Sequence, residues 1–218
     1  MNKVQTIRQI REIGIVPVIR ADSASEARRL VESILEGGIS IFEITMTVPN
    51  AVLLIESLVA DFRGIAIIGA GSVLEAKTAQ KCLAAGAQFI VSPALNLNVM
   101  QVCRQANVAI FPGALTPTEI IAAAHAGADA VKVFPANAVG GANYLKSIRA
   151  PLPDIELIPT GGVTLDTIGD FIRAGAIAAG VGSDLADVHA IRAGKREKVT
   201  QTARDFVKAV RDARLSPA

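Results

Sequence analysis

Short apolar runs rich in β-branched residues alternate along the chain with longer stretches in which apolar residues recur at helical spacing. This alternation is typical of a parallel β-sheet whose strands are joined by covering helices. The apolar runs predict eight strands, at Ile15–Ile19, Ile41–Thr45, Ala66–Gly69, Phe89–Ser92, Ala109–Pro112, Ala130–Phe134, Glu156–Pro159 and Ala178–Gly182.

Polar residues and glycines mark where the intervening helices begin and end. Ser23 with Glu26 matches a capping box, and Thr116 with Glu119 adds Pro117 at the first helical position. Four glycines in similar contexts are expected to end helices just before the next strand, as C′ residues: Gly37, Gly86, Gly127 and Gly175.

Eight βα units fit within the 218 residues without a Pro- or Ser-rich linker or a change in composition. We therefore predict an α/β protein with a single (β/α)8 (TIM) barrel domain spanning residues 1–218. Amphipathic patterns predict a short helix within residues 1–12 that caps the barrel and a final helix over residues 199–213. A doubly wound open sheet is the alternative, but no G-x-G-x-x-G follows the first strand.

Composition narrows the classes of partner. The chain is 51% hydrophobic, and 22 basic and 20 acidic residues are spread along it without a basic stripe, so we expect no nucleic-acid partner. No apolar run approaches the roughly 18 residues of a membrane span, and the N-terminus does not resemble a secretory signal. Two cysteines (Cys82 and Cys103) and two unclustered histidines (His125 and His189) indicate no disulfide framework, metal or cofactor, and favour a reducing cytoplasm.

Two ionisable residues interrupt apolar strands that the pattern predicts to be buried. Lys132 lies within Ala130–Phe134, and Glu43 lies within Ile41–Thr45. A lysine ammonium removed from water loses its proton more readily, and the neutral amine can attack a carbonyl carbon to form a Schiff base. A neighbouring carboxylate can move protons in both directions. The pair predicts a carbonyl-activating enzyme; an ion pair that only fixes the barrel register is the alternative.

Further polar residues occur where the predicted strands end. Arg20 follows the first strand, Ser72 the third and Ser183 the eighth, while Thr160 stands at the end of the seventh. The active site of a (β/α)8 barrel lies at the C-terminal ends of its strands, so we expect these side chains to surround one site.

Two glycine-containing loops point to a phosphorylated ligand. Residues 160–163 read Thr-Gly-Gly-Val and follow the seventh strand, while residues 180–183 read Gly-Val-Gly-Ser and follow the eighth. Backbone amides in such loops can bind an anion, and the loops after strands seven and eight are a frequent phosphate site in these barrels. Simple βα turns are the alternative for either loop alone.

Seven segments occur in an order and at a spacing that match a known family. They are Gly14–Arg20, Phe42–Thr45, Gly69–Val73, Phe89–Pro93, Pro112–Gly113, Lys132–Pro135 and Pro159–Val163. Between about residues 8 and 185 the chain resembles the 2-keto-3-deoxy-6-phosphogluconate (KDPG) and 4-hydroxy-2-oxoglutarate (KHG) aldolases. The resemblance implies a metal-free class I aldolase on a (β/α)8 barrel, usually a homotrimer.

The resemblance also implies roles for individual residues. Lys132 would be the Schiff-base lysine and Glu43 the acid/base. The expected substrate-binding residues are those of the pyruvate end, those of the phosphate end and others between them: Arg20, Thr45, Ser72, Pro93, Phe134, Thr160, Gly161, Gly162, Gly182 and Ser183. Many members carry arginine where this chain has Thr47, which shifts the expected carboxylate contact towards Arg20.

The implied activity is cleavage of 2-dehydro-3-deoxy-6-phosphogluconate to pyruvate and glyceraldehyde 3-phosphate. Cleavage of 4-hydroxy-2-oxoglutarate to pyruvate and glyoxylate is a further possibility, and the corresponding phosphogalactonate is an alternative substrate. Two hypotheses from other functional classes remain. One is a phosphosugar isomerase or epimerase that acts without a covalent intermediate, and the other is a non-catalytic protein that binds a phosphorylated ligand.

Overall fold

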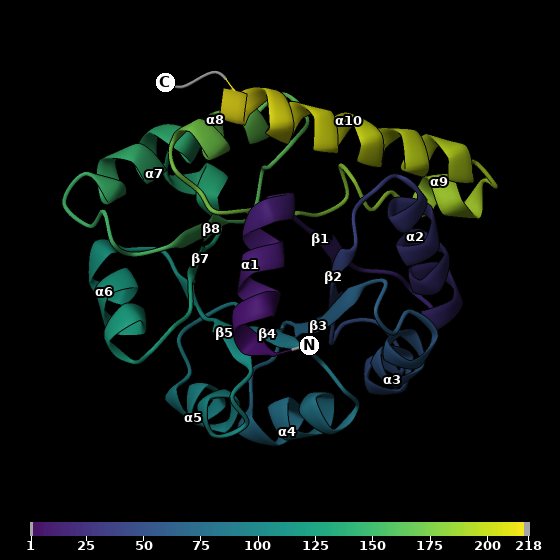
Figure 1. Ribbon diagram of the computed structural model, residues 1–218, viewed down its shortest axis with the longest axis horizontal. Coiled ribbons are helices and arrows are strands. Elements are labelled where there is room, and N and C mark those ends of the chain that lie inside the picture. Colours follow the sequence, from purple (N-terminus) through teal and green to yellow (C-terminus); the bar gives the residue numbers. More distant parts are fainter. Residues whose placement is uncertain (1, 216–218) are drawn as a thin grey trace.

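The structure, a computed structural model, describes residues 2–215, and its strands form a parallel barrel surrounded by helices (Figure 1). The strands are β1 (Ile15–Ile19), β2 (Ile41–Thr45), β3 (Ile67–Gly71), β4 (Phe89–Val91), β5 (Ala109–Phe111), β6 (Gly113–Ala114), β7 (Val131–Val133), β8 (Leu157–Pro159) and β9 (Ala179–Val181). The helices are α1 (Lys3–Ile13), α2 (Ala24–Glu36), α3 (Ala51–Asp61), α4 (Ala76–Ala84), α5 (Leu97–Gln105), α6 (Pro117–His125), the 3₁₀-helix η1 (Ala136–Val139), α7 (Gly141–Arg149), α8 (Ile168–Arg173), α9 (Val188–Arg192) and α10 (Arg196–Leu215).

The strands pair in the order expected of a barrel. One sheet runs β5-β4-β3-β2-β1-β9 and the other runs β6-β7-β8. Only Pro112 separates β5 from β6, and an isolated parallel bridge between Thr160 and Gly180 joins the β8 side to β9. The predicted fifth strand is broken because proline has no N–H to donate to a neighbouring strand. The predicted α/β barrel is confirmed.

The helix boundaries confirm one capping box and correct another. At Thr116 both capping hydrogen bonds are present. At Ser23 the side chain accepts from the Glu26 N–H, but the Glu26 carboxylate pairs with Arg192, whose guanidinium lowers the pKa of Glu26 to about 2. The capping box predicted there is therefore only half formed.

The predicted C′ glycines adopt positive φ with one exception. Gly86, Gly127 and Gly175 have φ of 91°, 92° and 93°, one residue beyond a helical cap. Gly37 has φ −78° and is itself the cap, while Gly38 adopts φ 95°. The C′ glycine is therefore Gly38 and not the predicted Gly37. Close packing explains the glycine at position 37, because a Cβ there would approach Ala203 Cβ to 2.3 Å.

The helix α1 closes the N-terminal end of the barrel. Its Ile10 is fully buried in an interior cluster with the first residues of several strands, which are Ile41, Ile67, Phe89 and Ala109. An ion pair between Lys3 and Asp129 (2.6 Å) and another between Arg11 and Glu156 tie the helix to the loops around it. The barrel is therefore accessible from the opposite end, where the strands terminate.

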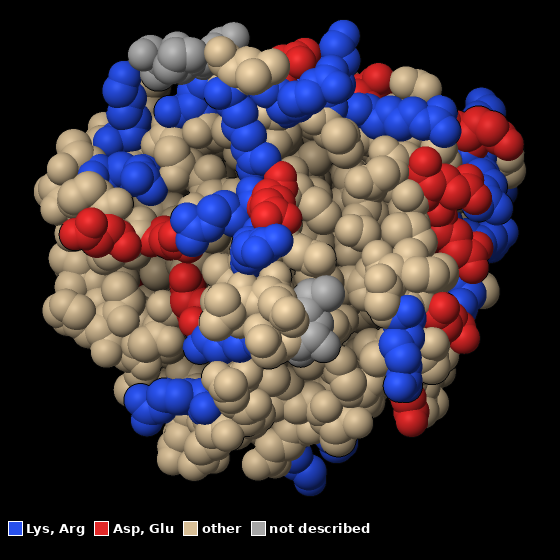
Figure 2. All heavy atoms as spheres, in the orientation of Figure 1, with Lys and Arg blue, Asp and Glu red and all other residues tan. Residues whose placement is uncertain are grey.

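Charges on the face that carries α1 are mixed (Figure 2). Basic residues are frequent along α10, but Glu197, Asp205 and Asp212 interrupt them. Across residues 2–215 no helix combines the length and the apolar character needed to cross a membrane.

Replacing Ile10 by alanine should lower the free energy of unfolding by about 2–4 kcal/mol, because it leaves a cavity in the barrel floor. Val4 on the same helix is 75% exposed, so Val4→Ala should change stability by less than about 0.5 kcal/mol. Urea denaturation of the two variants measures both values. Equal destabilisation would show that α1 does not close a packed core.

Candidate active site

Lys132 and Glu43 meet inside the barrel. Lys132 is the middle residue of β7 and Glu43 the middle residue of β2, and they are 4% and 2% exposed. Lys132 Nζ lies 3.7 Å from Glu43 Oε1. Within residues 2–215 this oxygen has no hydrogen-bond partner, although it is buried. The pair is close enough to interact electrostatically but is not joined by a hydrogen bond.

A small inner chamber adjoins the two side chains. It has a volume of about 10 Å³, enough for roughly one water molecule. Besides Lys132 and Glu43, its walls are mostly apolar: Val16, Val91, Phe111, Ile158, Thr160 and Gly180. The Phe134 ring centroid lies 5.3 Å from Lys132 Nζ, within the range of a cation–π contact. The chamber is therefore poorly solvated, which strengthens any interaction of the pair with a bound group.

Glycines on β3 make room for this arrangement. A Cβ at Gly71 would lie 2.0 Å from Glu43 Oε1, and one at Gly69 would lie 2.4 Å from the ring of Phe89. The two glycines are two residues apart, so both face the barrel interior. The Gly-Ala-Gly spacing of residues 69–71 was the sequence signal for this constraint, and its meaning was missed.

A larger outer cavity of about 190 Å³ opens above the chamber at the C-terminal ends of β1, β8 and β9. It brings together seven of the predicted substrate-binding residues: Arg20, Phe134, Thr160, Gly161, Gly162, Gly182 and Ser183. Thr160 and Gly180 line both spaces, so the chamber and the cavity adjoin. Four further wall residues, Val18, Val163, Gly180 and Asp184, were not among the predicted site residues. The first three lie within segments that the sequence had singled out, whereas Asp184 carries no distinctive motif.

The outer cavity offers hydrogen-bond donors more than charge. Arg20 and Asp184 line it together, so their formal charges offset each other. Gly161 and Gly162 have φ of 94° and 70°, a conformation that favours glycine. Among the described residues no carbonyl or side chain accepts from either glycine N–H. Arg20 likewise forms no ion pair within residues 2–215. These groups can therefore receive an anionic ligand.

Three predicted residues lie outside both spaces. Thr45 is buried at the end of β2, where its hydroxyl donates to Ile19 O (2.9 Å) and lies 2.6 Å from Thr47 Oγ1. Ser72 follows β3 with φ 57°, and Pro93 follows β4 with its carbonyl against Gly113. All three stand at strand ends β2 to β4, away from the glycine loops of β8 and β9.

Cysteine chemistry is not part of the site. Cys82 and Cys103 are buried free thiols, and burial raises their pKa values to about 11 and about 12. Residues 2–215 contain no group of three or more His, Cys, Asp or Glu side chains that could hold a metal ion.

The geometry suits covalent carbonyl chemistry on a substrate with an anionic tail. A ketone beside Lys132 would also lie beside Glu43, while the remainder of the molecule could extend past Thr160 towards the free glycine amides. A purely structural ion pair would be expected to gain hydrogen bonds in exchange for its desolvation, whereas Glu43 Oε1 has none within the described chain.

The sequence also matches known proteins over most of its length. Residues 6–202 match the family described as "KDPG and KHG aldolase". The chain is 32% identical over 206 residues to a 2-dehydro-3-deoxy-phosphogluconate aldolase of Haemophilus influenzae, covering 93% of this chain and 95% of that one. It is 34% identical over 204 residues to a 2-dehydro-3-deoxy-6-phosphogalactonate aldolase of Escherichia coli, covering 93% and 97%.

Among solved structures, the chain is similar to KDPG aldolase from Legionella pneumophila, in which pyruvate was captured at low pH as a covalent carbinolamine intermediate. The TM-score is 0.82 at 27% identity, and the match covers 88% of this chain and 93% of that one.

Proposed function

The chain belongs to the KDPG and KHG aldolase family, and on this basis we propose that it cleaves 2-dehydro-3-deoxy-6-phosphogluconate to pyruvate and glyceraldehyde 3-phosphate by a Schiff-base mechanism. The observation that carries the proposal is the buried pair of Lys132 and Glu43, 3.7 Å apart beside an apolar chamber. The carbinolamine captured in the Legionella relative supports the covalent step.

Lys132 is the proposed nucleophile. Nζ first gives one proton to Glu43 and then, as the neutral amine, attacks the C2 ketone to form a carbinolamine. Glu43 returns that proton to the carbinolamine hydroxyl, which leaves as water, so the product is a protonated imine. The imine withdraws electrons, so the C3–C4 bond can break with its electron pair moving towards the imine nitrogen to form an enamine. The aldehyde product leaves as the C4 hydroxyl gives up its proton.

Glu43 is the proposed acid/base. Its carboxylate, directly or through a water molecule, accepts the C4 hydroxyl proton and then returns a proton to C3 of the enamine. Water then adds to the resulting imine, and its hydrolysis releases pyruvate and restores the amine of Lys132. The unpartnered Oε1 is the oxygen available for these transfers.

We assign the rest of the substrate to the outer cavity and the strand ends. The phosphate would be received by the N–H groups of Gly161 and Gly162 and by Ser183, with Gly182 beside it. Arg20 is the proposed carboxylate partner, and Thr160 and Phe134 stand between the two ends of the substrate. Ser72 and Pro93 follow β3 and β4 outside both spaces, and we propose them for the pyruvate side of the mouth; Thr45, whose hydroxyl donates to Ile19 O, would support that side from within the wall.

Two other substrates remain candidates on the same site. The similarity to the E. coli aldolase supports 2-dehydro-3-deoxy-6-phosphogalactonate as a candidate, a compound that differs from the phosphogluconate at one carbon. The family description supports 4-hydroxy-2-oxoglutarate as the other candidate. The ratio of kcat/KM values for the three compounds, measured under one set of conditions, decides the preference.

Incubation with pyruvate and sodium borohydride should produce a reduced pyruvyl adduct on Lys132, visible by intact and peptide mass spectrometry. Lys132→Ala should form no adduct and lose cleavage activity by more than about a thousandfold. Full activity in Lys132→Ala would refute the covalent mechanism. Failure of the folded wild type to form any adduct would favour the isomerase or the non-catalytic binder instead.

Glu43→Gln should still form the borohydride adduct but slow cleavage by about 10²–10⁴-fold, because the amide cannot accept the hydroxyl proton. Exchange of the pyruvate C3 protons with deuterium from D₂O should fall to a similar extent. The reduced adduct in the same variant serves as the control for folding and imine formation. Unchanged exchange would exclude Glu43 as the proton-transfer group.

We further propose a homotrimer and a cytoplasmic location. Leu53 on α3, Leu74 before α4 and Leu97 on α5 are 65%, 61% and 62% exposed, and Asn96 Nδ2 donates to Leu74 O, which links the last two segments. These apolar side chains lie along one side of the barrel, where subunits could pack. The buried free thiols are consistent with a reducing compartment.

Light scattering of the purified protein should give a mass of about three chains, and Leu97→Asp should shift it towards one chain by placing a charge in the proposed contact. Leu165→Asp, at a leucine that is 41% exposed beyond the β8 loop, is the matched control and should leave the mass unchanged. A wild-type monomer would exclude the trimer.

A further inference from the structure

The turn that follows the lysine strand is hydrogen-bonded to the glycine loop of the outer cavity. In η1, the Ala136 N–H donates to Thr160 O (2.8 Å), and the Asn137 N–H donates to Gly161 O (3.2 Å). Two consecutive carbonyls of the loop after β8 therefore point at η1, which lies directly after β7 in the chain.

These two bonds determine where the loop amides point. A trans peptide group is planar, and its N–H points opposite to its C=O. Because Thr160 O and Gly161 O face η1, the N–H groups of Gly161 and Gly162 face away from it. Both glycines line the outer cavity, and neither N–H has a partner among residues 2–215. The hydrogen bonds from η1 thus leave two adjacent N–H groups of the loop free to donate to a ligand.

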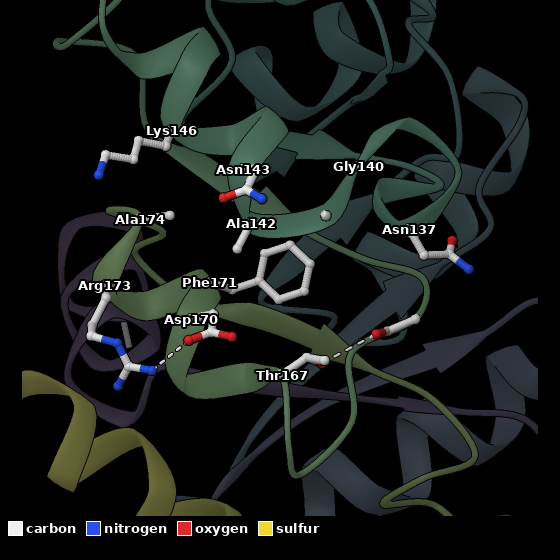
Figure 3. A pocket seen from close by; sticks show the side chains of 12 residues that line it. Asn137, Gly140, Ala142, Asn143, Lys146, Thr167, Asp170, Phe171, Arg173 and Ala174 are labelled. Carbon is white, nitrogen blue, oxygen red and sulfur yellow. Dashed lines mark hydrogen bonds and ion pairs between the residues drawn. The ribbon is translucent and has the colours of Figure 1, made fainter. Parts of the chain in front are cut away.

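The Asn137 side chain holds the same loop by packing. A Cβ at Gly162 would lie 2.4 Å from Asn137 Cβ and 3.0 Å from its Nδ2, and one at Gly161 would lie 3.4 Å from its Oδ1. Asn137 therefore rests directly against the two glycines. Gly162 also lines a groove of about 590 Å³ between α7 and α8, shown in Figure 3 with Asn137 and Asn143 among its walls.

The loop is also held by Thr167, the residue that precedes α8. Thr167 Oγ1 donates to Gly162 O at 3.3 Å, a contact drawn in Figure 3. The third consecutive carbonyl of the loop is therefore also held, but by a separate element. The orientation of the two free amides depends on η1, because only the carbonyls of Thr160 and Gly161 belong to the same peptide groups as those amides.

We propose that Asn137 is a positioning residue that holds the Gly161 and Gly162 amides towards the phosphate of the substrate, an inference that rests on the proposed function. The turn connects the Schiff-base strand to the phosphate loop, so the distance between the reacting carbonyl and the anchored phosphate is set by η1. Asn137 itself touches no substrate atom in this account; it acts through the loop.

Asn137→Asp tests this role with a near-isosteric change that places a negative charge beside the two loop glycines. We expect KM for 2-dehydro-3-deoxy-6-phosphogluconate to rise about tenfold through like-charge repulsion, with less than a twofold change in kcat. Deuterium exchange of pyruvate C3 protons uses the chemistry end alone and should change less than twofold. Asn143→Asp makes the same charge change in the same groove, whereas the atoms nearest the loop glycines belong to Pro135 and Asn137, so it should leave both measurements unchanged.

Asn137→Gly provides a second test without added charge, and should raise the same KM about threefold by loosening the loop. The proposal fails if both Asn137 variants keep the wild-type KM, or if they lower pyruvate exchange as much as cleavage, which would indicate a general structural role. The proposed function fails separately if the wild type neither cleaves the phosphorylated substrate nor exchanges pyruvate protons.

Discussion

The burial of an amine and a carboxylate within one apolar barrel is the constraint on which the rest of this structure depends. Lys132 and Glu43 are almost completely removed from water, yet they are 3.7 Å apart and Glu43 Oε1 accepts no hydrogen bond from the described residues. Such an arrangement costs stability, since desolvation of two charges is only partly offset by their attraction. The surrounding framework must supply that stability and keep the chamber closed to bulk water.

Packing below and beside the pair meets this requirement. α1 closes the N-terminal end of the barrel with Ile10, and Phe89 and Phe111 pack with their ring centroids 5.8 Å apart in the same interior cluster. Gly69 admits the Phe89 ring and Gly71 admits the carboxylate, so a side chain at either position would displace a group that the interior needs. The small residues of β3 are therefore determined by the large and charged residues on its neighbours.

How much of the fold and of the site can be predicted from the sequence depends on how far apart along the chain the interacting residues lie. Strands such as Ile15–Ile19 and Ile41–Thr45 were predicted with their observed bounds because apolar β-branched runs are a local signal. Lys132 and Glu43 were found because a charge in such a run is conspicuous. The partner of Glu26 could not be found, since Arg192 lies 166 residues further on. The hydrogen bonds from η1 to the β8 loop join backbone groups, which leave no mark in residue identity.

The inner chamber and the outer cavity differ in their electrostatics, which suits them to different parts of the proposed reaction. The inner chamber concentrates titratable groups in an apolar setting, where proton transfer and imine formation gain from weak solvation. In the outer cavity the charges of Arg20 and Asp184 offset each other, and backbone bonds hold the peptide groups of the glycine amides, which therefore need little reorganisation when an anion arrives. In the proposed mechanism, binding energy gained at the remote phosphate would hold the ketone against Lys132. Because Thr160 and Gly180 line both spaces, and only two residues separate β7 from η1, the proposed anchoring end and the proposed reacting end are joined through the same part of the barrel wall.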